Sequence, residues 1–104
     1  MITVITSFRL SEPITREEAR SLFLSKAARY RGVPGLVRKY YVLSEDGSAA
    51  GGVYLWRSRA EAEKMYTEHW KVLAQETFGA APSVTYFESP VVVDNVMDQI
   101  LSDE

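Results

Sequence analysis

The chain has 104 residues, 46% of them hydrophobic and 25% charged, which predicts one globular domain over residues 1–104 with a single core. The net charge of −2 provides no basic surface for nucleic acid, and no apolar run approaches the ~20 residues of a membrane span. The absence of cysteine excludes disulfides and thiolate metal sites, and with an N-terminus unlike a signal peptide it leads us to expect a cytoplasmic protein.

The first half of the chain reads as a strand, a helix and a second strand. Apolar and polar residues alternate over Ile2–Leu10, which predicts the first strand. Thr15 and Glu18 form a capping box that begins a helix, and Gly32 ends it. Leu36–Leu43 is predicted as the second strand.

An acidic glycine turn over 45–48 predicts a hairpin between the second strand and a third strand over Ala50–Trp56. The pair Gly51-Gly52 indicates a bulge or a close approach of backbone in that third strand. Ser58 begins a second helix, and its spacing predicts that His69 lies on the face that points toward the sheet.

The last part of the chain contains one more sheet strand and an arm. Alternation predicts the fourth strand over Val84–Glu88. Residues 89–104 then form a C-terminal arm, in which Val91–Val93 is extended and Asp94 caps a short helix that runs through Leu101.

The element order βαββαβ is typical of the α+β ferredoxin-like fold, the split βαβ plan, with two helices on one face of an antiparallel sheet. Apolar residues fall on both faces of the strands, and an apolar sheet face on a small protein usually marks an interface. A second copy packed sheet to sheet would cover that face. We therefore expect a homodimer that forms through the sheet face and the C-terminal arm.

The chain resembles the dimeric α+β barrel superfamily and, within it, the YdhR-type monooxygenases. The matching residues are Pro34-Gly35-Leu36, Lys39 with Tyr41, the run from Gly51 to Trp56, and His69 in an acidic helix. This resemblance implies a homodimer with a pocket between helices and sheet in each subunit. It also implies a cofactor-independent monooxygenase that acts on a small aromatic or polycyclic phenol, by proton abstraction and direct reaction of the substrate with O2.

Three kinds of side chain are candidates for the chemistry. His69 is a candidate general base because imidazole titrates near neutral pH, and its alternative is a half-buried histidine bonded to a backbone carbonyl. Tyr41 and Tyr54 could orient a substrate oxygen and Trp56 could stack on a ring, whereas the alternative is packing in the core and dimer interface.

Arg38 and Lys39 are expected to point to opposite faces of the second strand. The one that faces the helices or the interface could hold a phenolate, and the alternative is an apolar stem with an exposed head. The predicted catalytic residues are His69, Tyr41 and Tyr54, and the predicted substrate-binding residues are Trp56, Arg38, Lys39, Phe23 and Tyr66.

Two other functions remain open at this stage. Haem-degrading members of the superfamily use a histidine of the second helix, near the place of His69, but also a strand-one asparagine where this chain offers Thr6 and Ser7. The second alternative is a non-catalytic dimer that binds a small ligand. With one histidine and no cysteine, the sequence predicts no metal cluster and no cofactor, with haem as the exception.

Overall fold

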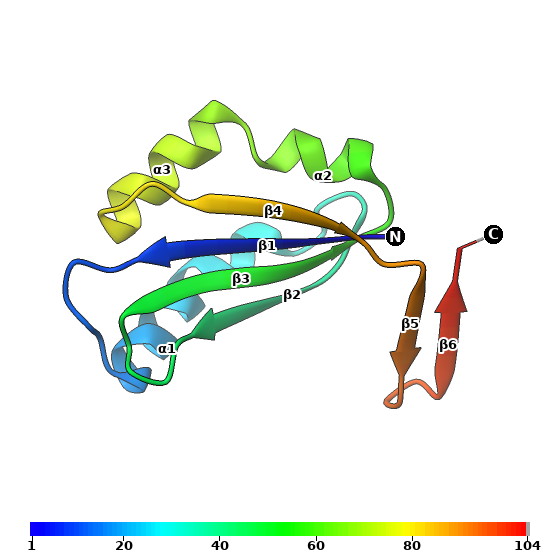
Figure 1. Ribbon diagram of the computed structural model, residues 1–104, viewed down its shortest axis with the longest axis horizontal. Coiled ribbons are helices and arrows are strands. Elements are labelled where there is room, and N and C mark those ends of the chain that lie inside the picture. Colours follow the sequence, from blue (N-terminus) through cyan, green and yellow to red (C-terminus); the bar gives the residue numbers. More distant parts are fainter. Residues whose placement is uncertain (104) are drawn as a thin grey trace.

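The computed structural model shows helices packed on one face of a four-stranded antiparallel sheet, which confirms the predicted ferredoxin-like α+β fold (Figure 1). It describes residues 1–103, so Glu104, at the end of the predicted arm, lies outside the described residues. No helix in the described part is long and apolar enough to cross a membrane. The elements are β1 (Ile2–Arg9), α1 (Arg16–Ala27), a 3₁₀ turn η1 (Ala28–Tyr30), β2 (Leu36–Leu43), β3 (Ala49–Trp56), α2 (Arg59–Met65), α3 (Glu68–Phe78), β4 (Ser83–Glu88), β5 (Val91–Asp94) and β6 (Gln99–Ser102).

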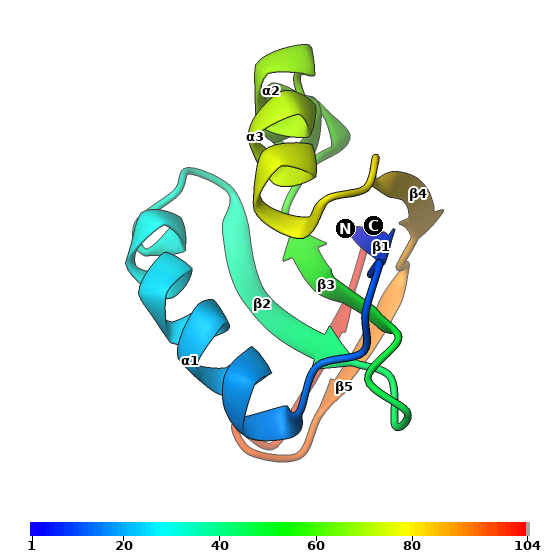
Figure 2. The same ribbon diagram turned by 90° about the vertical axis from the view of Figure 1, so that its left-hand side faces the viewer.

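The sheet has the order β2-β3-β1-β4, and its register sorts the side chains onto two faces. Thr6 pairs with Gly52, which in turn pairs with Tyr41. α1 runs along β2, whereas α2 and α3 lie over β1 and β3 (Figure 2). We call the face under the helices the inner face and the opposite one the outer face. The inner face carries Ile2, Val4, Thr6, Phe8, Lys39, Tyr41, Leu43, Ala50, Gly52, Tyr54, Trp56, Val84 and Tyr86.

The core lies at the end of the inner face where β3 meets α2. Trp56 is fully buried, and its indole N–H donates a hydrogen bond of 3.0 Å to the hydroxyl of Tyr66. The ring of Tyr54 stacks against Trp56 with 6.3 Å between centroids. Burial raises the pKa of Tyr66, so its hydroxyl stays protonated and neutral within the core.

The predicted second helix is divided into α2 and α3. Tyr66 has φ −90° and ψ 56°, outside the helical region, and turns its ring into the core. Thr67 then caps a new helix by accepting a hydrogen bond of 3.2 Å from the backbone N–H of Trp70. His69 therefore lies in the first turn of α3 and is exposed. The predicted orientation of His69 toward the sheet was wrong, because the periodicity counted from Ser58 does not continue through the break.

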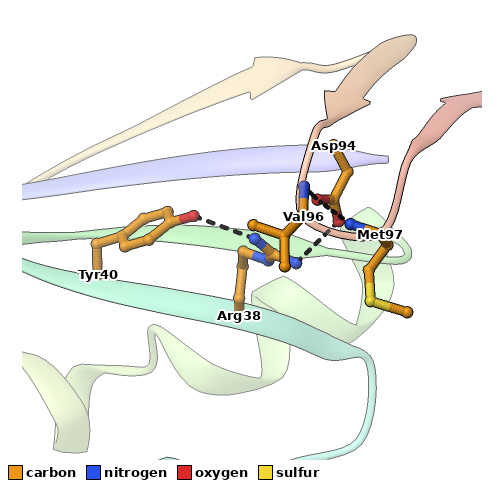
Figure 3. A network of polar contacts seen from close by, with 5 residues as sticks. All are labelled: Arg38, Tyr40, Asp94, Val96 and Met97. Atoms are coloured by element: carbon orange, nitrogen blue, oxygen red, sulfur yellow. Dashed lines mark hydrogen bonds and ion pairs between the residues drawn. The ribbon is translucent and has the colours of Figure 1, made fainter.

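The predicted terminal helix was also wrong, since residues 91–102 form the hairpin β5–β6. The carboxylate of Asp94 accepts hydrogen bonds of 3.0 and 3.1 Å from the N–H groups of Val96 and Met97, which holds the chain in a turn (Figure 3). Asp98 has φ 52°, a left-handed conformation that reverses the chain instead of continuing a helix. The extended segment predicted at Val91–Val93 is confirmed as part of β5.

The outer face is mixed, and several of its large apolar side chains are exposed in the single chain. The exposed fractions of Ile5 and Tyr40 are 39% and 53%. The hairpin β5–β6 lies beside one end of this face and leaves a hollow of about 690 Å³ between them. Other large apolar side chains exposed on the outer face or the hairpin are Val42, Phe87, Val91, Val93, Val96, Met97 and Ile100.

Candidate active site

A cavity of about 200 Å³ lies between the inner face of the sheet and the helices α1 and α3. Within residues 1–103 its lining contains no Asp or Glu, and aromatic rings form much of its wall. Its lining residues are Thr6, Phe8, Lys26, Arg29, Tyr30, Lys39, Tyr41, Gly51, Tyr54, Met65, Trp70, Leu73, Ala74, Thr77 and Phe78. A wider groove of about 700 Å³ lies between α1 and the end of β2, and Tyr41 lines both hollows.

The amine of Lys39 lies inside a group of three tyrosine rings. Its Nζ is 3.4 Å from the ring centroid of Tyr30, 3.8 Å from that of Tyr41 and 4.6 Å from that of Tyr54. Among the described residues it forms no ion pair. Burial lowers the pKa of Lys39 to about 7, because desolvation disfavours the ammonium form. Lys39 therefore changes charge near neutral pH, as an ordinary lysine does not.

Gly52 makes the room that the Lys39 side chain occupies. A Cβ atom at position 52 would lie 3.2 Å from Cε of Lys39 and 2.9 Å from Cε1 of Tyr54. The N–H of Gly52 donates a hydrogen bond of 3.0 Å to the hydroxyl of Thr6, which fixes β3 at this point. The predicted close approach of backbone is confirmed at Gly51, where a Cβ atom would lie 2.0 Å from the backbone oxygen of Thr6, whereas at Gly52 it is side chains that need the room.

The tyrosines contribute neutral hydroxyl groups to the site. Burial raises the pKa of Tyr41 to about 12 and also raises that of Tyr54. The hydroxyl of Tyr41 is buried and has no hydrogen-bond partner among residues 1–103, so its donor is left unused. The hydroxyl of Tyr30 accepts a hydrogen bond of 3.3 Å from the indole of Trp70.

The structure brings together only some of the residues that the sequence proposed. Lys39, Tyr41 and Tyr54 line one cavity, and Phe23 supports it from the groove by stacking on Tyr41 with 4.9 Å between centroids. The others do not line it: Trp56 and Tyr66 belong to the core, Arg38 lies on the outer face, and His69 is exposed on α3.

Sequence reasoning missed two important side chains of the cavity, Tyr30 and Trp70. Tyr30 falls at helical spacing from Phe23 and Ala27, which is the signal that could have placed it on the sheet-facing side of the first helix. Trp70 follows Thr67 at the spacing of a helix cap and its third residue, which is the signal that could have placed it at the start of α3. Both residues line the cavity, and Nζ of Lys39 lies over the ring of Tyr30.

The cavity does not fit the haem alternative. The histidine proposed as iron ligand, His69, is exposed and is not among the lining residues. Within residues 1–103 no group of three or more His, Cys, Asp or Glu side chains is placed to hold a metal ion.

The chain matches a family model and several solved structures. The profile of the family described as "Putative mono-oxygenase ydhR" matches residues 4–88. A monooxygenase from the gene ActVA-Orf6 of Streptomyces coelicolor, solved with nanaomycin D, is 18% identical over 85% of this chain and 86% of its own, with a TM-score of 0.64. A comparison with curated proteins finds no match.

Two further solved structures show the same fold. SnoaB, a cofactor-independent oxygenase from Streptomyces nogalater, is 16% identical over 85% of this chain and 91% of its own, with a TM-score of 0.61. Rv0793 from Mycobacterium tuberculosis is 19% identical over 85% of this chain and 93% of its own, with a TM-score of 0.59. At these identities the structural likeness establishes the fold, and the chemistry has to be argued from the cavity.

Proposed function

The chain belongs to the ydhR mono-oxygenase family, and on that premise we propose that the Lys39 cavity is the active site of a cofactor-independent monooxygenase for small phenols. The observation that carries this proposal is a lysine amine, able to lose its proton near neutral pH, inside an aromatic cavity. The cavity volume of about 200 Å³ is below the ~300–1,000 Å³ common for ligand pockets. This size favours a phenol of one or two rings over a larger polycyclic one.

Lys39 is the group best placed to act as the base. The neutral amine takes the phenol proton, and the tyrosine rings around Nζ stabilise the resulting ammonium. The ammonium in turn pairs with the phenolate, which makes the phenolate available as an electron donor. The free hydroxyl of Tyr41 donates a hydrogen bond to a substrate or peroxide oxygen.

The phenolate then reacts directly with dioxygen. The substrate supplies all four electrons, so one oxygen atom enters the ring as a quinone carbonyl and the other leaves as water. No flavin or metal is needed for this balance. The assignment of the base to His69 stays an untested prediction, and we place the role on Lys39 because His69 is exposed. Tyr54 was predicted as a catalytic residue that orients a substrate oxygen, and we propose that it serves as a wall of the pocket.

We further propose that the working form is a homodimer, a dimeric α+β barrel closed by two outer faces. The apolar side chains left exposed on that face, Ile5, Tyr40, Val42 and Phe87 among them, support this assembly. The hairpin β5–β6 adds exposed valines at the rim, where it could reach a partner.

Oxygen uptake tests the proposed reaction. Phenols, naphthols and three-ring phenols are offered in turn with EDTA present and no flavin added, and products from 18O2 are identified by mass spectrometry. We expect turnover of one- or two-ring phenols with one labelled oxygen in the product, and kcat/KM that rises with pH through about 7. Ligand binding without oxygen uptake in any of these classes would instead favour the non-catalytic binding dimer.

A further inference from the structure

We propose that Lys39 also captures small aromatic aldehydes and ketones, by forming a Schiff base between its Nζ atom and the carbonyl carbon. This activity uses the same cavity as the proposed monooxygenase but none of its oxygen chemistry. The experiment that tests one activity therefore does not decide the other.

The surroundings of Lys39 keep its amine available as a nucleophile. The cavity lining contains the cations Lys26 and Arg29 and, within the described residues, no carboxylate that would hold an ammonium. The other titratable side chains that face Lys39 are Tyr30, Tyr41 and Tyr54, whose rings surround Nζ. Burial raises the pKa of Tyr41 and of Tyr54, so neither carries a charge at pH 7. A desolvated lysine beside cationic groups is one of the arrangements by which proteins make this side chain reactive toward carbonyls.

The cavity also supplies a hydrogen-bond donor for the reaction. The nitrogen lone pair of the neutral amine adds to the carbonyl carbon, the two amine hydrogens pass to the carbonyl oxygen, and loss of that oxygen as one water leaves the C=N bond. The hydroxyl of Tyr41 lacks a hydrogen-bond partner among residues 1–103, and Nζ of Lys39 lies 3.8 Å from the centroid of the same ring. In the proposed reaction this unused donor bonds the carbonyl oxygen and then the departing water.

Aromatic carbonyl compounds suit the walls better than aliphatic ones. Besides the tyrosines, the rings of Phe8 and Phe78 stack with 4.3 Å between centroids, and Trp70 lies 6.4 Å from Phe8. These rings offer an apolar surface on which a flat ligand can stack. The volume of about 200 Å³ limits the ligand to a small ring system, so benzaldehyde is a suitable probe.

The proposal is tested by comparing how strongly each lysine of the chain is labelled by an aromatic aldehyde. The chain has three other lysines, Lys26, Lys64 and Lys71. With benzaldehyde and cyanoborohydride, a captured lysine gains the mass of the aldehyde and two hydrogens less one water, and peptide mapping locates it. At pH 7 a group with pKa about 7 is about half neutral, whereas an ordinary lysine near 10.4 is neutral in about one molecule in 2,500.

We expect labelling of Lys39 to exceed that of Lys64 and Lys71 on the order of 100-fold, since lower basicity offsets part of the gain in neutral fraction. The reaction is run without oxygen, and benzaldehyde is not a phenol, so failure of the monooxygenase proposal leaves this result unaffected.

Unfolding the protein in urea should reduce the labelling of Lys39 to the level of the other lysines. The inference is overturned if the folded protein shows Lys39 labelled no faster than Lys64. The Lys64→Met variant serves as the matched control and should keep full labelling at Lys39.

Discussion

Arg38 and Lys39 are neighbours on β2 with the same formal charge, yet they lie on opposite faces of the sheet. The Arg38 guanidinium is exposed, lies 3.2 Å from the Asp94 carboxylate and donates to the hydroxyl of Tyr40, and these contacts raise its pKa (Figure 3). The Lys39 amine is enclosed by tyrosines, and burial lowers its pKa to about 7. The difference shows that burial without a counterion, and not charge itself, gives β2 its candidate reactive group.

The same contrast extends over the two faces. The inner face gathers the cavity, the unpartnered hydroxyl of Tyr41 and the glycine that admits Lys39. The outer face carries apolar side chains such as Ile5 and Tyr40 that remain exposed in the single chain. We therefore assign ligand chemistry to the inner face and assembly to the outer face, and changes on each face should have separate effects.

Replacing the cavity lysine should have the largest effect on activity. Lys39→Met keeps a long apolar stem but removes the base, so we expect kcat/KM for the best phenol to fall roughly 1,000-fold. Oxygen uptake measures the loss, and circular dichroism checks the fold. Lys64→Met, on the exposed side of α2, should retain wild-type activity. A Lys39→Met protein that is folded and active would remove Lys39 from the mechanism.

The same variant should be more stable than the wild type at low pH, and the difference should depend on pH. Below about pH 7 the folded wild type holds a buried ammonium, so the whole desolvation cost of that charge lowers its free energy of unfolding. Between pH 7 and ~10.4 the unfolded chain binds a proton that the folded chain has lost, so wild-type stability rises relative to the variant, by about 1 kcal/mol per pH unit. Urea unfolding of both proteins at pH 6 to 9 tests this trend. A constant difference would mean that Lys39 keeps an ordinary pKa.

The sequence predicted that the side chains of Arg38 and Lys39 point to opposite faces of the sheet, but not which of them points to the inner face. Leu36 pairs with Trp56 at the inner face, and strict alternation from Leu36 would place Arg38 inward. A register shift between Leu36 and Arg38 reverses that phase and turns Lys39 inward. The shift depends on pairing with β3, which local alternation does not encode.

Gly51 and Gly52 are successive residues of β3 and lie on opposite faces of the sheet, so a methyl group added at each position meets different neighbours. A Cβ at Gly51 would lie 2.0 Å from the backbone oxygen of Thr6, so Gly51→Ala should cost about 3 kcal/mol, measured by urea unfolding. Gly52→Ala meets the flexible stem of Lys39 and the Tyr54 ring instead, so we expect a smaller loss of stability together with about tenfold lower activity. Equal losses of stability for the two variants would contradict this distinction.

A charge on the outer face should disrupt assembly and leave the cavity unchanged. Ile5→Glu places a carboxylate on the outer face beside Val53, the register partner of Ile5 on β3, and we expect dimer dissociation to become at least about 100-fold more favourable. Sedimentation velocity over a range of concentrations measures this change. Val72→Glu on α3, where the exposed fraction of Val72 is 52%, is the control and should not alter assembly. A wild type that stays monomeric at all concentrations would rule out the proposed dimer.

The two largest errors of prediction share a physical origin. Thr67 offers a cap that restarts the helix, although the sequence predicted one continuous helix there. Asp94 was predicted to cap a short helix, but its carboxylate closes a turn instead. A side chain that accepts backbone N–H groups stabilises either a helix start or a tight turn. The neighbouring residues select between these two structures. At Thr67 the selection comes from the burial of Tyr66, and at Asp94 from the pairing of 91–94 with 99–102; both depend on tertiary structure.

The smallest effect is expected where charge is exposed. Arg38→Ala removes an ion pair whose guanidinium is exposed to solvent, where screening and side-chain entropy offset the attraction, so we expect no resolvable change in Tm or activity. Asp94→Ala removes the same ion pair together with the two backbone hydrogen bonds of the hairpin turn, so a small decrease in Tm should appear. Thermal unfolding at low and high salt distinguishes the contributions, because only the ion pair is screened by salt. If Arg38→Ala lowered activity as Lys39→Met should, the outer face would belong to the active site, and the separation of chemistry from assembly would not hold.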